Sequence, residues 1–509
     1  MNKSTEQIIK SELAKKVFTS EMSRDYSLPD YQPEIKRLMK ISACVLPPKM
    51  DFGMDDAVFS GNIDYYVLYL GVDNQMYCAP ISDEYVINMP LDGSEMGEFA
   101  DGFVDIMADS VGGRVTAPRK ITIRTRLKSA ATVFANTYEN EAFSDSTPDD
   151  SIERLSGVVM SANISRVTSD VQNVTDEVIL DTRDGDVRVI CADGRVMLSE
   201  VKGNKNEMLL RGDAYVKILA CKENAGEPYV IQRKLPIFAT VPIEGADVDA
   251  SLFAKGSVSE LSVIVDEGRI SLEVGVVFDC MCLKNLPVTY TKDMYSTACV
   301  TKCEYKDYNV VSEGGGGFSN FTSSEARTLE ELGIPDGSRY VDASGVVYID
   351  SVEYENMRMK FAGRIKYIVL MESDGEYSSK EIELPYSFIA DNKRGCKNAF
   401  YTAELISTRG KIDGERISLD SEIALTYQTY NKEPISQLSA MHFGEGVSKN
   451  KNQTVVIFPS GEESVWSISK KNYISPERLV KSNPELAGKG ATVSLDDVGA
   501  LASVHHIII

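Results

Sequence analysis

The residues best suited to chemistry in this 509-residue chain are four cysteines that lie close together: Cys280, Cys282, Cys299 and Cys303. Structural zinc sites usually have two to four residues between a pair of cysteines, whereas Cys280 and Cys282 have only one residue between them. In a strand, alternate residues share a face, and a cysteine there behaves as a small apolar side chain. We therefore expect core packing at Cys280 and Cys282, and metal binding by the four thiols stays open.

Catalysis by other groups has little support in the sequence. The three histidines are His442, His505 and His506. Ser–His–Asp and Cys–His mechanisms need a positioned imidazole, and two of these lie at the C-terminal end. The 76 acidic residues are spread so widely that no carboxylate pair stands out. Rossmann and HExxH motifs do not occur. We expect a protein that is not an enzyme and that needs no cofactor.

An internal repeat is the strongest pattern in the chain. Gly61, Gly212 and Gly363 are spaced by 151 residues both times, and each begins a run of alternating apolar residues. Each run is followed by a second strand-like stretch near a proline: Pro80, Pro236 and Pro385. Further alternating stretches follow at 121–127, 270–276 and 417–423. Period-two alternation predicts strands, and a repeat of this length can hold its own core. We expect a mainly β, multidomain protein with three tandem β-sandwich-like repeats.

Breaker-rich stretches suggest where these repeats join. They are 141–152, 312–320 with four consecutive glycines, and 444–453. The glycine run lacks the Lys-Ser/Thr of a P-loop, which favours a linker over a phosphate cradle. Asp145, Asp149 and Asp150 could attract calcium, but the stretch lacks the glycine and distal glutamate of an EF-hand loop, which favours a solvated linker. The expected segments are an N-terminal helical segment at 1–25, repeats at 26–145, 152–311 and 321–445, and a C-terminal module at 454–509, with short helices at 30–41, 152–158 and 323–332.

The C-terminal module has its own pattern. Val455–Phe458 reads as a strand, and Ser464 can cap a helix over 465–471. Ser475 and Pro476 are typical of a second helix start, and Asn483-Pro484 should end that helix. A last strand is expected near 504–509. Trp466, Ile468, Leu479 and Val480 could form a small core. The module is therefore predicted to be a small α+β unit of βααβ order.

This order and these residues resemble a LysM module. LysM modules usually bind glycans that contain N-acetylglucosamine, in a groove between the strand–helix loop and the loop after the second helix. The resemblance implies these binding residues: Glu462, Glu463, Ser464, Trp466, Asn483, Pro484, Glu485 and Leu486. The family's Gly-Asp-Thr is replaced here by Glu462-Glu463-Ser464, which removes a flexible glycine and adds charge. Glycan and protein therefore both stay open as partners, and Trp466 could simply pack in the core.

Residues 28–45, LPDYQPEIKRLMKISACV, resemble the opening of the SPOCS domain of spore-forming Firmicutes. Three such domains before a LysM module resemble the layout of the SipL-like family of clostridial spore-coat morphogenetic proteins. That resemblance implies a scaffold at the forespore surface, in the mother-cell cytoplasm and spore coat. It also implies a partner, the spore coat morphogenetic ATPase (stage IV sporulation protein A), bound through the LysM-like module. Binding of peptidoglycan in the spore cortex or cell wall is the alternative.

Charge and hydropathy fit this expectation. The net charge of −22 opposes binding to nucleic acid or anionic lipid. The first residues lack the apolar stretch of a secretory signal, and no run approaches the roughly 18 apolar residues of a membrane span. Nine cysteines, an odd number, are typical of a reducing compartment. We expect a cytoplasmic protein without a transmembrane segment.

Overall fold

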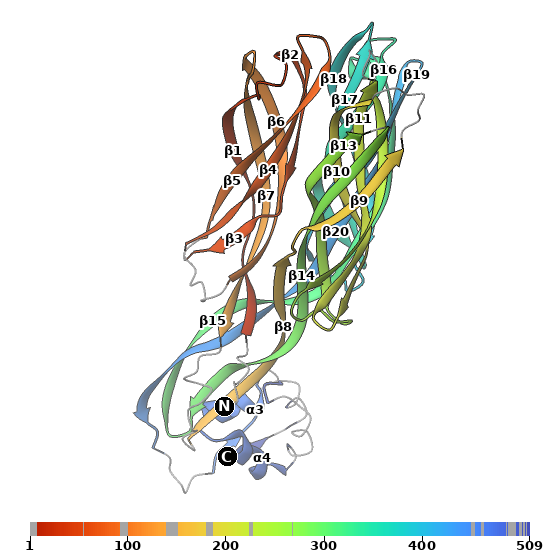
Figure 1. Cartoon of the computed structure of the whole chain (residues 1–509). Helices are drawn as coiled ribbons and strands as arrows, with labels where there is room; N and C mark the ends of the chain where they lie inside the picture. Colours follow the sequence, from red (N-terminus) through yellow and green to blue (C-terminus); the bar gives the residue numbers. More distant parts are fainter. Residues whose placement is uncertain are drawn as a thin grey trace.

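A computed structural model shows that the chain is mainly β, with 78% of the described residues in strands and 5% in helices. The strands form several separate sheets in one elongated body, and a small helical module lies at one end (Figure 1). The structure describes residues 8–53, 55–91, 100–138, 151–179, 187–222, 227–266, 268–448, 454–459, 463–484, 486, 495–497, 501, 504 and 506–509.

One order of strands occurs three times along the chain, in segments that we call unit 1 (8–138), unit 2 (152–296) and unit 3 (299–446). Unit 1 contains β1 (Ile8–Ser27), β2 (Ile35–Val45), β3 (Lys49–Phe52), β4 (Asp56–Gly71), β5 (Met76–Pro90), β6 (Ala100–Ala117) and β7 (Lys120–Tyr138). Strands β2, β4 and β5, with β3 beside β4, make one antiparallel sheet. Strand β1 pairs with β7, which pairs with β6, in the other sheet.

Units 2 and 3 repeat this arrangement. Unit 2 contains β8 (Ile152–Thr168), β9 (Gln172–Ile179), β10 (Val187–Asn204), β11 (Glu207–Lys222), β12 (Tyr229–Pro242), β13 (Ser251–Asp266) and β14 (Arg269–Ser296). Unit 3 contains β15 (Cys299–Thr328), α2 (Leu329–Leu332), β16 (Arg339–Glu355), β17 (Arg358–Ser373), β18 (Glu376–Asp391), β19 (Asn398–Asp413) and β20 (Arg416–Gly446). Their separate sheets are β10-β11-β12, β13-β14-β8 and β16-β17-β18. The strands β19-β20-β15 continue into unit 1 through the pairing of β15 with β1, which makes one six-stranded sheet, β19-β20-β15-β1-β7-β6.

The repeated glycines occupy equivalent places. Gly61, Gly212 and Gly363 lie in the middle strands β4, β11 and β17. A Cβ on Gly212 would lie 2.3 Å from the Met197 carbonyl oxygen, and one on Gly363 would lie 1.9 Å from that of Tyr348. Both contacts are far too short, so these positions need glycine. The stretches 121–127, 270–276 and 417–423 lie in β7, β14 and β20, so the predicted strands are confirmed.

Equivalent side chains from all three units meet in shared cores. Phe103, Phe253 and Phe400 form a trio whose ring centroids are 5.3, 4.4 and 6.0 Å apart. Two further triplets share buried clusters: Leu68, Leu219 and Leu370, and Ile9, Val159 and Val310. Mutual contact among equivalent residues means that the units surround a common axis. Each unit has a core of its own, as expected, but the expectation of separate tandem repeats needs correction, because apolar residues on a second face of each unit are also buried between units.

Three equivalent arginines, also spaced by 151 residues, join neighbouring units. Arg188 of unit 2 donates to the Met76 carbonyl oxygen of unit 1 at 2.9 Å. Arg339 of unit 3 lies 3.3 Å from Glu227 of unit 2. Arg37 of unit 1 lies 3.7 Å from Glu376 of unit 3 and also donates to the Tyr377 carbonyl oxygen. Each arginine thus reaches β5, β12 or β18, the third strand of another unit's three-stranded sheet, or the residues just before that strand. Unit 2 contacts unit 1, unit 3 contacts unit 2 and unit 1 contacts unit 3, so the three units form a closed ring.

Several local expectations need correction. Residues 8–25 of the expected N-terminal helical segment lie in strand β1 (Ile8–Ser27), because pairing with β7 along the whole strand outweighs a local preference for helix. Stretches 30–41 and 152–158 contribute to β2 and β8. Of 323–332, only Leu329–Leu332 is helical, after a cap at Thr328. The repeat boundaries expected at 26 and 321 fall inside β1 and β15.

The glycine-rich stretch 312–320 is not a linker. It lies inside β15 and pairs with β20. A Cβ on Gly316 would lie 2.4 Å from the Leu252 carbonyl oxygen of unit 2, and one on Gly314 would lie 2.3 Å from the sulfur of Cys396. The glycines therefore allow close approach of other chain segments. Residues 444–446 belong to β20, whereas 141–150, with its three aspartates, and 449–453 lie outside the described residues.

Candidate functional site: the C-terminal module on the strand ribbons

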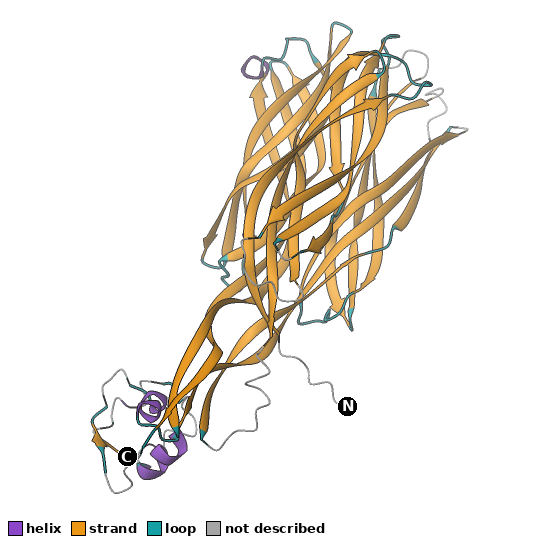
Figure 2. Ribbon diagram, turned by 90° about the vertical axis from the view of Figure 1, so that its left-hand side faces the viewer, coloured by secondary structure: helices purple, strands orange, loops and turns teal. Residues whose placement is uncertain are grey.

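Two ribbons of long strands connect the main body to the helical module. Strand β14 pairs with β8 up to Ser296, and β15 pairs with β20 from Cys299. Figure 2 shows these strands continuing beyond the main body and ending beside the helices. Ile9, Val159, Tyr290, Val310 and Ile435 fill a buried cluster where the ribbons leave the body. The ribbons thus form an ordered support for the module.

The described elements of the module follow the predicted order strand, helix, helix, strand. They are β21 (Val456–Ile457), α3 (Val465–Lys471), α4 (Pro476–Ser482) and β22 (Ile507–Ile508), and β21 pairs with β22. Ser464 caps α3, and Ser475 caps α4 with proline at its first position, as expected. Ile468 and Leu479 are buried in the module's own core, with Val480 packed against it, which confirms that part of the expected core.

Trp466 lies outside that small core and packs on unit 2 instead. It shares a buried cluster with Leu155 of β8 and Tyr295 of β14. The Trp466 and Tyr295 rings meet edge to face, with centroids 4.9 Å apart. The indole Nε1 donates a 2.8 Å hydrogen bond to Oδ2 of Asp293. Trp466 is 5% exposed, so its present role is to hold the module on the ribbon.

Asp293 is the centre of this contact. Besides Trp466, it accepts a 2.7 Å hydrogen bond from the Lys470 ammonium and one of 2.7 Å from the Tyr305 hydroxyl. Burial, together with the nearby Asp293 carboxylate, raises the pKa of Tyr305, which keeps the phenol protonated as a donor. One carboxylate therefore connects the β14 ribbon, the β15 ribbon and helix α3.

Two more contacts fix the module. The Tyr295 hydroxyl donates to the Ile474 carbonyl oxygen at 2.6 Å. Lys292 pairs with Asp496 at 2.7 Å. Ile474 precedes α4 and Asp496 follows it, so the two contacts hold the module in one orientation.

The residues predicted from the LysM resemblance lie in different environments. Ser464 and Leu486 are buried, as cap and core residue. Asn483 is buried too, and its side chain bonds the Leu479 carbonyl oxygen at 2.8 Å and the Ile508 amide at 2.7 Å. Glu463 lies 3.6 Å from Lys471, and Pro484 is exposed. Glu462 and Glu485 lie outside the described residues.

An apolar surface remains open on the module's small sheet, and we call it the β21–β22 face. Val456 and Ile508 are cross-strand partners and are 50% and 40% exposed. Phe458, two residues beyond Val456, is 76% exposed. Sequence reasoning missed this face, although the run Val455–Phe458 has more apolar residues than one buried side of a strand needs. No local signal marked Asp293 or Tyr295.

The cysteine cluster is divided between different environments. Cys280 and Cys282 are buried in the core of unit 2, as interpreted from the alternation. Burial raises the pKa of Cys282 to about 11 and that of Cys280 further. The Cys303 thiol donates to the Met294 carbonyl oxygen at 3.1 Å. Among the described residues, no group of three or more His, Cys, Asp or Glu side chains is placed to hold a metal.

His442 lies on the surface. Its ring nitrogen is 3.5 Å from the Glu304 carboxylate, and both side chains are more than half exposed. His505 lies outside the described residues, and His506 is exposed.

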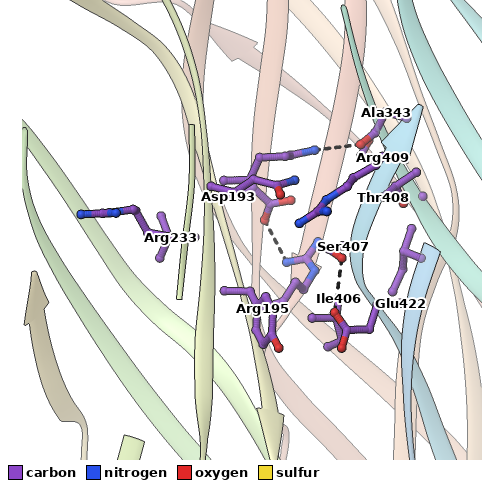
Figure 3. Close-up of a pocket in the computed structure, with 16 residues that line it drawn as sticks. Asp193, Arg195, Arg233, Ala343, Ile406, Ser407, Thr408, Arg409 and Glu422 are labelled. Atoms are coloured by element: carbon purple, nitrogen blue, oxygen red, sulfur yellow. Dashed lines mark hydrogen bonds and ion pairs between the residues drawn. The ribbon is translucent and has the colours of Figure 1, made fainter. Parts of the chain in front are cut away.

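A pocket of about 90 Å³ lies between units 2 and 3 (Figure 3). Its charged groups are largely engaged with one another: Arg195 bonds Asp193 at 3.0 Å, and Ser407 lies 3.5 Å from Glu422. Arg233 points away from the other labelled side chains. The Lys217 ammonium of unit 2 also donates to the Ala343 carbonyl oxygen of unit 3 at 2.8 Å, which joins the two units at the pocket. These engaged groups leave little polar capacity for a substrate.

Comparison with known proteins finds no relative. No family model, curated protein or solved structure matches the chain. No helix in the described ranges is both long and apolar enough to cross a membrane.

Proposed function

We propose that this protein is a non-catalytic scaffold in spore coat assembly. In this proposal the three units are SPOCS-like domains of β-sandwich type, and the C-terminal module is LysM-like. The module binds a coat morphogenetic protein, the stage IV sporulation protein A ATPase, while the body holds it at a fixed position. The family resemblance of the sequence supplies the biological setting and the partner.

The observation that carries the scaffold proposal is the way the module is mounted. Trp466 and Lys470 fix it to Asp293 at the far end of two long ribbons. A body with shared cores and one projecting module suits a part that positions a partner, since a rigid mount reduces the ordering cost of binding.

A protein partner is favoured over glycan by the state of the LysM-like loops. Ser464, Asn483 and Leu486 are buried in structural roles, and Trp466 is covered by unit 2. The β21–β22 face offers Val456, Phe458 and Ile508 to solvent instead. Exposed aromatic and aliphatic side chains at the centre of a patch are typical of protein contacts.

Capture of the purified ATPase by the full chain tests this proposal. We expect Val456→Ser combined with Phe458→Ser to weaken capture by about tenfold or more, because central apolar contacts carry most of an interface's energy. Val248→Ser is the matched control, since Val248 is 88% exposed on unit 2, away from the module. It should leave capture unchanged.

Two results would count against the proposal. If the wild-type chain does not capture the ATPase, the assigned partner is wrong. If the double variant captures it as well as the wild type, the β21–β22 face is not the docking surface. Pelleting of the same proteins with peptidoglycan gives the alternative its own test, because co-sedimentation of the wild type would favour glycan binding.

A further inference from the structure

Two cysteines face each other where units 1 and 2 meet. Cys78 lies in β5 of unit 1, and Cys191 lies in β10 of unit 2. Their sulfur atoms are 2.9 Å apart, and both are free thiols. A disulfide needs a sulfur separation of about 2 Å, so roughly one ångström of side-chain movement would close the bond. The two sulfurs are therefore already in contact.

The surrounding contacts hold the two strands in place. Arg188, three residues before Cys191, bonds the Met76 carbonyl oxygen, two residues before Cys78. Both thiols pack against the same buried cluster, which includes Leu68 and Leu219. The pair is therefore fixed by neighbours on both strands, and the sulfurs face each other through the architecture of the body.

The charges near the pair make the two thiols unequal. The hydrogen bond from the Cys78 thiol lowers the pKa of Cys191 and, with burial, raises the pKa of Cys78. Lys40 and Lys217 add positive charge near Cys191, while Asp193 acts against them. Cys191 is therefore the thiol that ionises first, and a thiolate is the form that reacts with oxidants.

We propose that Cys78 and Cys191 form an oxidation site whose co-reactant is hydrogen peroxide and whose product is a disulfide between units 1 and 2. The Cys191 thiolate attacks one peroxide oxygen, which gives a sulfenic acid and releases hydroxide. The Cys78 sulfur then attacks the Cys191 sulfur, which forms the S–S bond and displaces the sulfenic oxygen as water. In total, two thiols lose two electrons and two protons, and one peroxide becomes two waters.

The bond would connect residues 113 positions apart in sequence. A cross-link over so long a loop restricts the unfolded chain strongly, so the oxidised body should resist denaturation better than the reduced one. Within the described chain, Cys280 and Cys282 lie along one strand and cannot join two units.

Mass spectrometry of the peroxide-treated full chain, digested without reductant, tests the proposal. We expect the Cys78–Cys191 cross-link to form at least about tenfold faster than any other cysteine pair, because the two sulfurs are held in contact. Dithiothreitol should remove the link and return the urea midpoint from its raised value to that of the reduced chain. Cys303→Ser is the control and should still form the link.

A trapping experiment separates the chemistry from mere proximity. In Cys78→Ser, the Cys191 sulfenic acid has no resolving thiol, so dimedone should label Cys191. In Cys191→Ser, labelling of Cys78 should be slower, since burial still raises the pKa of its thiol. The proposal is overturned if both cysteines stay reduced while other thiols oxidise, or if dimedone fails to label Cys191 in the first variant. The wild-type cross-link assay stands even if a variant does not fold.

Discussion

Substituting Asp293 with asparagine should release the C-terminal module from its support. The change keeps the shape of the side chain but removes the charge that accepts from Trp466 and Lys470. The bond from the buried indole to a charged acceptor contributes about 1.5–2 kcal/mol. The Lys470 side chain is 33% exposed, so solvent screening limits its pairing to about 1 kcal/mol or less. The docking free energy should therefore weaken by roughly 1.5–3 kcal/mol, or about 10- to 150-fold in the docking equilibrium.

The chain provides its own probe for this prediction. Trp466 is its single tryptophan, and the docked indole is 5% exposed. In Asp293→Asn, tryptophan emission should shift to the red, and its urea midpoint should fall below that of the far-ultraviolet circular dichroism signal, which reports the sheets. Asp307→Asn is the matched control, because Asp307 is an exposed acid of the neighbouring β15 ribbon. An emission maximum and a midpoint equal to wild type in Asp293→Asn would refute the assigned role of the carboxylate.

Three further predictions address the body. Gly363→Ala should lower the unfolding free energy by about 2–4 kcal/mol in chemical denaturation, because its Cβ would collide with the Tyr348 carbonyl, whereas Gly112→Ala meets open space and should change little. Phe400→Ala should cost about 3–5 kcal/mol and weaken all three units in one transition, and separate transitions would contradict the shared core. Burial raises the pKa of the Glu404 carboxyl, although the charges of Arg195 and Lys255 act in the opposite direction. The folded state therefore binds this proton more tightly than the unfolded state does. The carboxyl's contribution to stability falls as the pH rises above 4.5, the ordinary pKa of the group. Glu404→Gln removes that loss, so its unfolding free energy should gain on the wild type as pH rises through this window in urea titrations, and a parallel pair of curves would exclude the effect.

The strands were predictable where the pattern was local. Ile63, Tyr65 and Val67 alternate with less buried neighbours, and such a period-two pattern depends only on one face being covered. Strand β1 was not predictable in this way, because its pairing with β7 is a contact across about a hundred residues. The caps of the module helices were predictable, since Ser464 and Ser475 act on amides within their own first turns.

The packing of the three units around an axis has a signal in the sequence, at the places where the alternation of apolar and polar residues is interrupted. Residues 67–70 are buried without interruption, as are 218–221 and 369–371. A strand covered on both faces has a continuous apolar run, so the same interruption of alternation at the same place in each unit marks a second buried face. Which partner covers that face depends on packing between units, and the sequence pattern does not contain it. Trp466 illustrates the same limit, since an apolar residue at a helix start can pack inward or against another unit.

The charges at the axis explain why three similar units need not be interchangeable. At one set of equivalent positions the units carry Asp105, Lys255 and Thr402, and Lys255 pairs with Asp105 at 3.1 Å. At another set they carry Lys40, Cys191 and Asp342, and Lys40 lies 3.8 Å from Asp342. Three identical charges at either level would repel one another in a poorly solvated place, so charged residues can persist there only if the units differ. That divergence makes each contact between units specific to its own pair. The module docks on the ribbon of unit 2, because Asp293 and Tyr295, which hold it, both lie in β14.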